Sequence, residues 1–169
     1  MPSITLRHEL NTDEETYWAK IVFDETFNKK MYVDHMHFPV WKLLDQKEDD
    51  AKLTRRIQVD PPVGNLPGPL KKVIGDRLSY TEDGTFDKKT KKYSFKVTPS
   101  TMTDKTKVNG EMWVEKAGDK KVTRICRIDV EVKVFMVGGM VEERILSDLR
   151  DAYDRGTIFT NDYIKANGL

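Results

Sequence analysis

The sequence predicts an α+β fold in which a curved antiparallel β-sheet of six to seven strands wraps around one long C-terminal helix. Apolar and charged residues alternate from Ile128 to Val134, which is the pattern of a strand with one buried and one solvated face. After Gly138 and Gly139, apolar residues recur every three or four positions as far as Tyr163, which is the period of an amphipathic helix. Shorter alternating segments precede this region at regular intervals, as in an antiparallel sheet.

The first forty residues predict one strand and two short helices. Apolar residues alternate with polar ones over residues 4–10, which indicates the strand. Asp13 followed by Glu14 and Glu15 is a helix-start signal, because acidic side chains stabilise the positive end of a helix. We therefore expect a first helix directly after Asp13 and a second over residues 25–36.

The middle of the chain predicts the rest of the sheet. Further strands are expected at residues 40–46, 51–59, 77–85, 92–99, 105–115 and 121–134. The prolines after Asp60 end the second of these, since proline cannot donate to a strand ladder. Residues 63–75 predict a loop with one helical turn, and this loop is unusually apolar.

The composition indicates a soluble globular protein, organised as a single domain over residues 1–169. A hydrophobic content of 38% with 34% charged residues argues against both a disordered and a membrane-spanning chain. No apolar signal segment follows the N-terminus, and the single Cys126 excludes an internal disulfide, so we expect a cytoplasmic location. A net charge of +1 gives no reason to expect nucleic acid as a partner, and a monomer is favoured.

A sheet curved around a helix leaves a gap wherever the inward side chains do not meet. Small and mid-sized inward residues such as Val97, Val130 and Ala152 enlarge that gap, whereas aromatic residues close it. Two interpretations stay open at this point: a cavity for an apolar ligand, and a filled core.

The order of elements resembles the helix-grip fold of the START-like (SRPBCC) superfamily. Residues 66–75, which begin Leu-Pro-Gly-Pro-Leu, and residues 131–142, which contain Val-Gly-Gly-Met, resemble an uncharacterised family of bacterial START-like domains. Residues 41–163 are also similar to the sterol-binding VASt domain. The resemblance implies binding, or transport, of a lipid or other apolar molecule in a cavity, and it favours the cavity over the filled core. The superfamily also includes cyclases and hydrolases, so it implies an enzyme as an alternative.

The candidate ligand site consists of residues whose strand or helix phase points them inward. They are Trp41, Leu43, Leu53, Arg55, Ile57, Tyr80, Phe95, Val97, Met112, Val114, Ile128, Val130, Ile145, Leu149 and Tyr153. Arg55 or Tyr80 could orient a polar head group. Arg55 could also pair with Asp148 or reach solvent at the open end of the sheet, and we expect the last of these.

The loop over Leu66–Gly75 is the candidate gate. In START-like lipid carriers the corresponding loop gates the cavity, so the resemblance implies this role here. Lys71 and Lys72 beside its apolar residues would suit transient contact with a membrane surface. Alternatively, the loop only caps the core. The candidate gate residues are Leu66, Pro67, Pro69, Leu70, Val73 and Ile74.

The remaining reactive residues predict neither catalysis nor a metal site. His35 and His37 supply two ligands, whereas zinc normally takes three or four. Cys126 is expected to point inward and to be inert, because no basic neighbour is apparent. We expect no catalytic residue and no cofactor. A further alternative is a protein-interaction module with a filled core and residues 66–75 as its interface.

Overall fold

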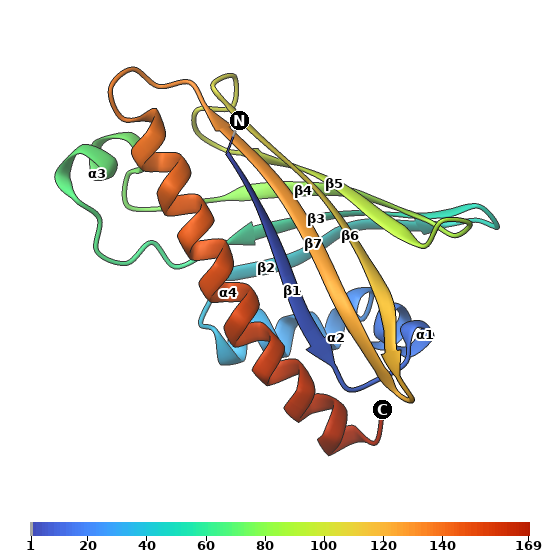
Figure 1. The fold of residues 1–169 in the computed structure, drawn as a ribbon. Coiled ribbons are helices and arrows are strands. Elements are labelled where there is room, and N and C mark those ends of the chain that lie inside the picture. Colours follow the sequence, from blue (N-terminus) through green and yellow to red (C-terminus); the bar gives the residue numbers. More distant parts are fainter. Residues whose placement is uncertain (1) are drawn as a thin grey trace.

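A seven-stranded antiparallel sheet, curled around one face of a long helix, forms the body of the protein (Figure 1). The computed structural model describes residues 2–169. The spatial order of the strands is β1-β7-β6-β5-β4-β3-β2, so the N-terminal strand pairs with the last one. The strands are β1 (Ser3–Leu10), β2 (Val40–Glu48), β3 (Lys52–Asp60), β4 (Tyr80–Asp87), β5 (Lys92–Pro99), β6 (Thr106–Gly118) and β7 (Lys121–Val132). The predicted α+β fold with a long C-terminal helix is confirmed.

The strand β7 ends two residues earlier than the alternation predicts. The backbone N–H of Val132 donates to the Glu142 carboxylate at 2.8 Å. At the end of β7 a side chain of the following helix therefore accepts this backbone hydrogen bond. A Cβ atom at Gly138 would overlap the Val132 carbonyl oxygen, so only glycine allows the helix start to lie this close to the strand.

Two short helical segments follow β1, as predicted, and they close one end of the sheet (Figure 1). The segments α1 (Glu14–Thr16) and η1 (Tyr17–Val22) follow Asp13, whose carboxylate accepts from the Thr16 N–H at 2.8 Å. The second pair, α2 (Glu25–Lys29) and η2 (Lys30–His35), follows Asp24, which caps Phe27 in the same way. Tyr17 and Trp18 of the first pair face the sheet, where they contact Met112 and Phe86, whereas Phe27 of the second pair packs on Phe159 and Tyr163 near the C-terminus.

The long helix α4 (Gly138–Asn167) packs on β1, β7 and η2 (Figure 1). At Gly156 the helix comes close to Met31 of η2, where an added Cβ atom would lie 3.3 Å from the Met31 sulfur. Gly168, in a left-handed conformation, ends the helix. Among residues 2–169, none of the helices combines the length and apolar character needed to span a bilayer.

The predicted loop over residues 63–75 contains a two-turn helix, α3 (Gly68–Ile74), which is longer than the single turn expected. Pro69 lies in its first turn, where a missing N–H costs nothing, and Gly75 ends it at a φ of 79°. Leu70 and Ile74 are buried against the core, while Pro67 and Pro69 face outward.

Two glycines make the inner face of the sheet flat enough for aromatic rings to lie across it. A Cβ atom at Gly84 of β4 would overlap the Tyr93 ring, and one at Gly110 of β6 would overlap the Phe95 ring. Both rings are therefore pressed against the sheet. This arrangement keeps them from filling the space under α4.

Asp60, the last residue of β3, is a buried carboxylate that pairs with Arg77. It is 1% exposed and accepts hydrogen bonds from Arg77 at 2.6 and 2.9 Å. Burial acts to raise the pKa of Asp60, but hydrogen bonds from Ser79, Arg77 and Gln58 outweigh it and hold the pKa below its usual value. The carboxylate thus stabilises the fold above its unfolded-state pKa of about 3.9, and this contribution is lost as the pH falls through the lower folded-state pKa. We expect Asp60→Asn to lower the free energy of unfolding by about 1–3 kcal/mol at neutral pH.

Urea unfolding of both proteins at pH 7 and pH 3 measures this effect. The difference between Asp60→Asn and wild type should shrink at pH 3. Asp83→Asn, which alters an exposed ion pair with Arg56, is the control and should cost less than about 1 kcal/mol. A deficit for Asp60→Asn that is unchanged at pH 3 would contradict the assignment.

Candidate functional site

A cavity of about 460 Å³ lies between the concave face of the sheet and α4. Its walls come from β2 to β7, from the helical segments between Tyr17 and Tyr32, from residues 61–64 and from one side of α4. The volume falls in the range of small-molecule sites, about 300–1,000 Å³. The side chains of the inner face therefore do not fill the space under the helix.

Eleven of the fifteen predicted ligand-site residues line this cavity. The lining includes Trp41, Arg55, Ile57, Tyr80, Phe95, Val97, Met112, Ile128, Ile145, Leu149 and Tyr153. Contact of these residues with a ligand stays a prediction.

The other four predicted residues lie outside the lining. Val130 has an exposed fraction of 0% and is among the largest fully buried side chains, next to Val108 in the strand ladder. Leu53 lies opposite Phe86, beyond the end of the cavity, while Leu43 and Val114 are packed against the core. Alternation predicts the face of a strand, and it cannot predict which part of that face α4 leaves uncovered.

The rim of the cavity is formed more by residues 61–64 than by the predicted gate. Of the six candidate gate residues only Ile74 reaches the lining, because Leu70 packs into the core and the prolines face outward. Arg144 of α4 donates to the Val63 carbonyl oxygen at 3.2 Å and so ties this rim to the helix. On α4 the rim is charged: Arg144 pairs with Asp148, and Arg155 pairs with Asp151.

Arg55 is buried inside the cavity, so the expectation that it reaches solvent is wrong. It donates to the Val22 carbonyl oxygen at 2.6 Å and lies 3.6 Å from the Glu82 carboxylate. It does not pair with Asp148, which instead binds Arg144 at 2.9 Å. The helical segments cover this end of the sheet, and the Val22 carbonyl oxygen at the end of η1 accepts the Arg55 hydrogen bond in place of water.

Glu82 and Tyr93 complete the group around Arg55. The Tyr93 hydroxyl donates to Glu82 at 2.7 Å and receives a hydrogen bond from Arg55 at 3.4 Å. Burial and the Glu82 carboxylate raise the pKa of Tyr93 well above its usual value, so the phenol is a neutral donor. Glu82 was missing from the predicted site, although it shares the parity of Tyr80 and lies opposite Ile57 and Val97.

Further phenols face the cavity. Burial and the Glu82 carboxylate raise the pKa of Tyr32 to about 12, and burial raises that of Tyr80 well above its usual value. Both are therefore uncharged at neutral pH and can donate a hydrogen bond to a ligand. Arg124 of β7 also lines the cavity and was not predicted, although it shares the inward parity of Cys126 and Ile128.

Cys126 and His35 pack against neighbouring side chains. Cys126 is buried, and burial raises the pKa of its thiol to about 11 while it donates to the Tyr153 hydroxyl. The His35 ring stacks on Phe159, and His37 adopts a φ of 58°. Across residues 2–169, no group of three or more His, Cys, Asp or Glu side chains is arranged to hold a metal ion.

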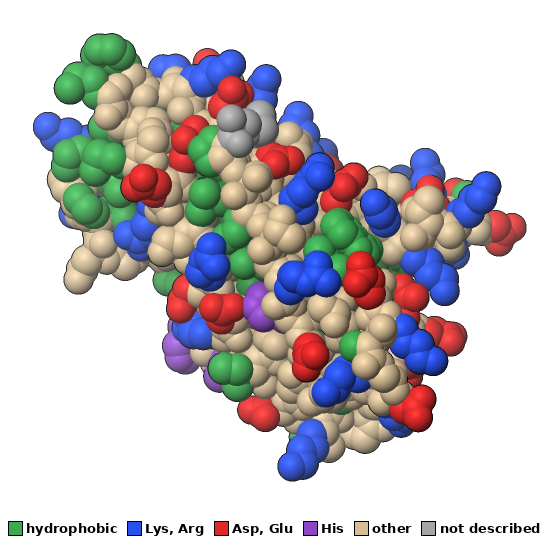
Figure 2. All heavy atoms as spheres, viewed as in Figure 1, with side chains coloured by type: hydrophobic (Ala, Val, Ile, Leu, Met, Phe, Trp, Pro, Cys, Tyr) green, Lys and Arg blue, Asp and Glu red, His purple; other side chains and the backbone are tan. Residues whose placement is uncertain are grey.

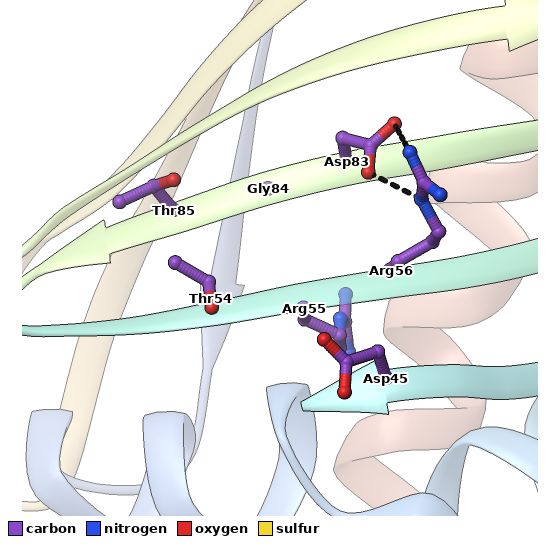
Figure 3. Close-up of a pocket in the computed structure, with 7 residues that line it drawn as sticks. All are labelled: Asp45, Thr54, Arg55, Arg56, Asp83, Gly84 and Thr85. Atoms are coloured by element: carbon purple, nitrogen blue, oxygen red, sulfur yellow. Dashed lines mark hydrogen bonds and ion pairs between the residues drawn. The ribbon is translucent and has the colours of Figure 1, made fainter. Parts of the chain in front are cut away.

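A second hollow of about 340 Å³ lies on the outer face of the sheet, between β2, β3 and β4 (Figure 3). The Arg56 side chain crosses it to Asp83, with hydrogen bonds of 2.7 and 3.3 Å, and two threonines flank it. It opens where the register of β2 shifts between Leu43 and Asp45. Its charged groups already satisfy each other, so it is the weaker candidate.

Comparison with known proteins places the chain in a family and identifies the fold. Residues 5–164 match the family described as "Protein of unknown function (DUF2505)". No curated protein matches the chain. The structure is similar to that of the Zhui aromatase/cyclase from Streptomyces sp. R1128, with a TM-score of 0.64 and 11% identity over 99% of this chain and 98% of that one.

Two other solved structures are similar. Norcoclaurine synthase from Thalictrum flavum, in complex with dopamine and hydroxybenzaldehyde, has a TM-score of 0.63 and 14% identity over 95% of this chain and 87% of that one. A START superfamily protein from Mycobacterium smegmatis has a TM-score of 0.57 and 15% identity over 92% and 96%. At such identities the likeness establishes the fold, which is the START-like helix-grip fold. The narrower resemblance to the VASt domain stays a prediction.

Proposed function

The chain belongs to the DUF2505 family of proteins of unknown function, and from its cavity we propose that it binds a lipid or other apolar small molecule between the sheet and α4. One observation carries the proposal: a space of about 460 Å³ lined largely by apolar and aromatic side chains. Burial of the ligand would contribute about 25 cal/mol per Å² of apolar surface, less the cost of ordering it. We also infer a monomer in the cytoplasm, in keeping with a single buried and unpaired cysteine.

Extraction of the purified protein tests the proposal. Protein isolated from its host is extracted with organic solvent, and the extract is compared with a blank by mass spectrometry. We expect a stoichiometric apolar molecule. An empty extract, together with no thermal shift from sterols, phospholipids or fatty acids, would overturn the proposal.

We further infer that the ligand is exchanged with a membrane at the end of the molecule that bears α3 and the β7–α4 loop. Phe135 and Met136 in that loop have exposed fractions of 90% and 85%, and Lys71 and Lys72 of α3 are exposed. Figure 2 shows hydrophobic side chains gathered at this end, where Figure 1 places both segments. Apolar side chains with lysines beside them suit an interfacial contact.

Phe135→Glu is expected to weaken binding to phosphatidylcholine vesicles by about tenfold, because a buried Phe side chain is worth about 1.5–3 kcal/mol. Co-sedimentation with the vesicles measures the bound fraction. Ile158→Glu is the control, since Ile158 is 66% exposed in the C-terminal half of α4. Equal losses in the two variants, or no loss in Phe135→Glu, would refute membrane contact at this end.

An enzyme acting on the bound molecule is the second candidate function. It is favoured by the hydrogen-bonded group of Arg55, Glu82 and Tyr93, which faces the cavity and could serve acid–base chemistry. The extracted molecule is incubated with ligand-free protein, and its mass is followed. An unchanged mass supports binding alone, whereas a new product that is absent with Glu82→Gln supports an enzyme.

A further inference from the structure

Arg124 and Arg55 are the two buried arginines that line the cavity, and within the part of the chain that the structure describes only Arg55 has a carboxylate at ion-pair distance. Arg124 is 8% exposed, and its guanidinium lies 4.8 Å from the centre of the Tyr153 ring of α4. Its Nη2 atom lies 3.0 Å from His8 Nδ1 and donates to the Thr157 hydroxyl at 2.8 Å. These contacts come from β1 and α4, so the side chain is held from two sides while it lines the cavity.

The contact with His8 fixes the proton on that ring. An arginine only donates hydrogen bonds, so His8 Nδ1 must accept, and the ring proton is on Nε2. Nε2 then donates to Asp154, whose Oδ1 atom is 2.6 Å away. Asp154 thus orients His8 and, through it, Arg124. Its own carboxylate is exposed and does not reach the guanidinium.

The charges that line the cavity leave Arg124 without a counterion. Arg55 has Glu82, Arg144 has Asp148, and Arg155 has Asp151. Within residues 2–169, no carboxylate lies at ion-pair distance from Arg124, and its buried Nε atom has no hydrogen-bond partner. The cavity lining contains four arginines and three carboxylates, so one arginine is in excess. An unpaired buried charge costs several kcal/mol, which an anionic ligand would offset.

We propose that Arg124 is the recognition site for a carboxylate, and that the bound molecule is an amphiphilic acid with its head group at Arg124 and its apolar part along the cavity. This inference rests on the proposed binding function and specifies its ligand class. The phenol of Tyr17 also lines the cavity, and its hydroxyl donates to the Met112 sulfur at 3.6 Å. Burial raises the pKa of Tyr17, and the Arg124 guanidinium opposes that rise. A neutral phenol supplies a second donor for the same carboxylate.

Dodecanoate and dodecan-1-ol, which differ in the head group, provide the test. Titration calorimetry of ligand-free wild-type protein is expected to show tighter binding of dodecanoate by about tenfold or more, as for a charge-assisted hydrogen bond in a buried site. Arg124→Gln should remove this preference by weakening dodecanoate and leaving dodecan-1-ol unchanged. Arg127→Gln, an exposed position on the opposite face of β7, should keep it. Circular dichroism establishes that each variant is folded.

The outcomes separate the two proposals. If wild type binds both probes with equal affinity, or Arg124→Gln retains the preference, the carboxylate site is refuted while apolar binding stands. If wild type binds neither probe, the carboxylate site is refuted, and the extraction and thermal-shift experiments decide whether another apolar molecule is bound. If Arg124→Gln does not fold, equal affinity of the wild type for the two probes still refutes the carboxylate site.

Discussion

Arg55→Met is expected to lower the free energy of unfolding by about 3–5 kcal/mol, because it removes one partner of a buried ion pair and leaves the other uncompensated. Arg55 joins the Val22 carbonyl at the end of η1 to Glu82 on β4, and its guanidinium stacks 5.3 Å from the centre of the Phe23 ring. Loss of the Arg55 side chain removes a link between the helical segments and the sheet. It also leaves the Glu82 carboxylate buried without a counterion. Urea unfolding followed by tryptophan fluorescence measures the change.

Arg56→Met is the matched control, since Arg56 is the next residue on β3 and points to the outer face. Its ion pair with Asp83 is solvent-exposed, so this change should cost less than about 1 kcal/mol. The double variant Arg55→Met/Glu82→Gln should regain part of the lost stability, because no unpaired charge then stays buried. Equal costs for Arg55→Met and Arg56→Met would show that the buried pair does not hold the helices.

Val97→Trp is expected to abolish ligand binding with little loss of stability, whereas Val130→Trp is expected to destabilise the fold by about 1–3 kcal/mol or more. Both positions are valines on inward strand faces. Val97 lines the cavity, so the indole has space to occupy, while Val130 is fully buried in contact with its neighbours. The same chemical change therefore distinguishes empty space from packed core.

Thermal unfolding and extraction with mass spectrometry, applied to both variants, test this pair. The expected result is a ligand-free but stable Val97→Trp and an unstable Val130→Trp. If Val97→Trp proved as unstable as Val130→Trp, the space beneath α4 would be filled by side chains in solution. The protein would then be better described as an interaction module with a packed core.

The face of each strand could be predicted because alternation depends only on neighbours in the sequence. Ile57, Val97 and Ile128 lie on the inner face as predicted, and so does Cys126. Glu82 and Arg124 obey the same alternation but are not among the predicted site residues. Their charge suggests a solvated face, and only a partner supplied from elsewhere in the fold makes burial acceptable.

The sequence by itself determined the α+β fold, the order of the strands along the chain and the long amphipathic helix, since these follow from local periodicity and from helix-start signals such as Asp13. Only the tertiary structure decided that Arg55 meets Glu82, that Arg124 lacks a counterion, and that Val130 is packed while Val97 faces a cavity. The physical reason is the separation along the chain of the residues that interact. Periodicity assigns a side chain to a face, but ion pairs and cavities depend on distances between segments that the chain brings together from far apart.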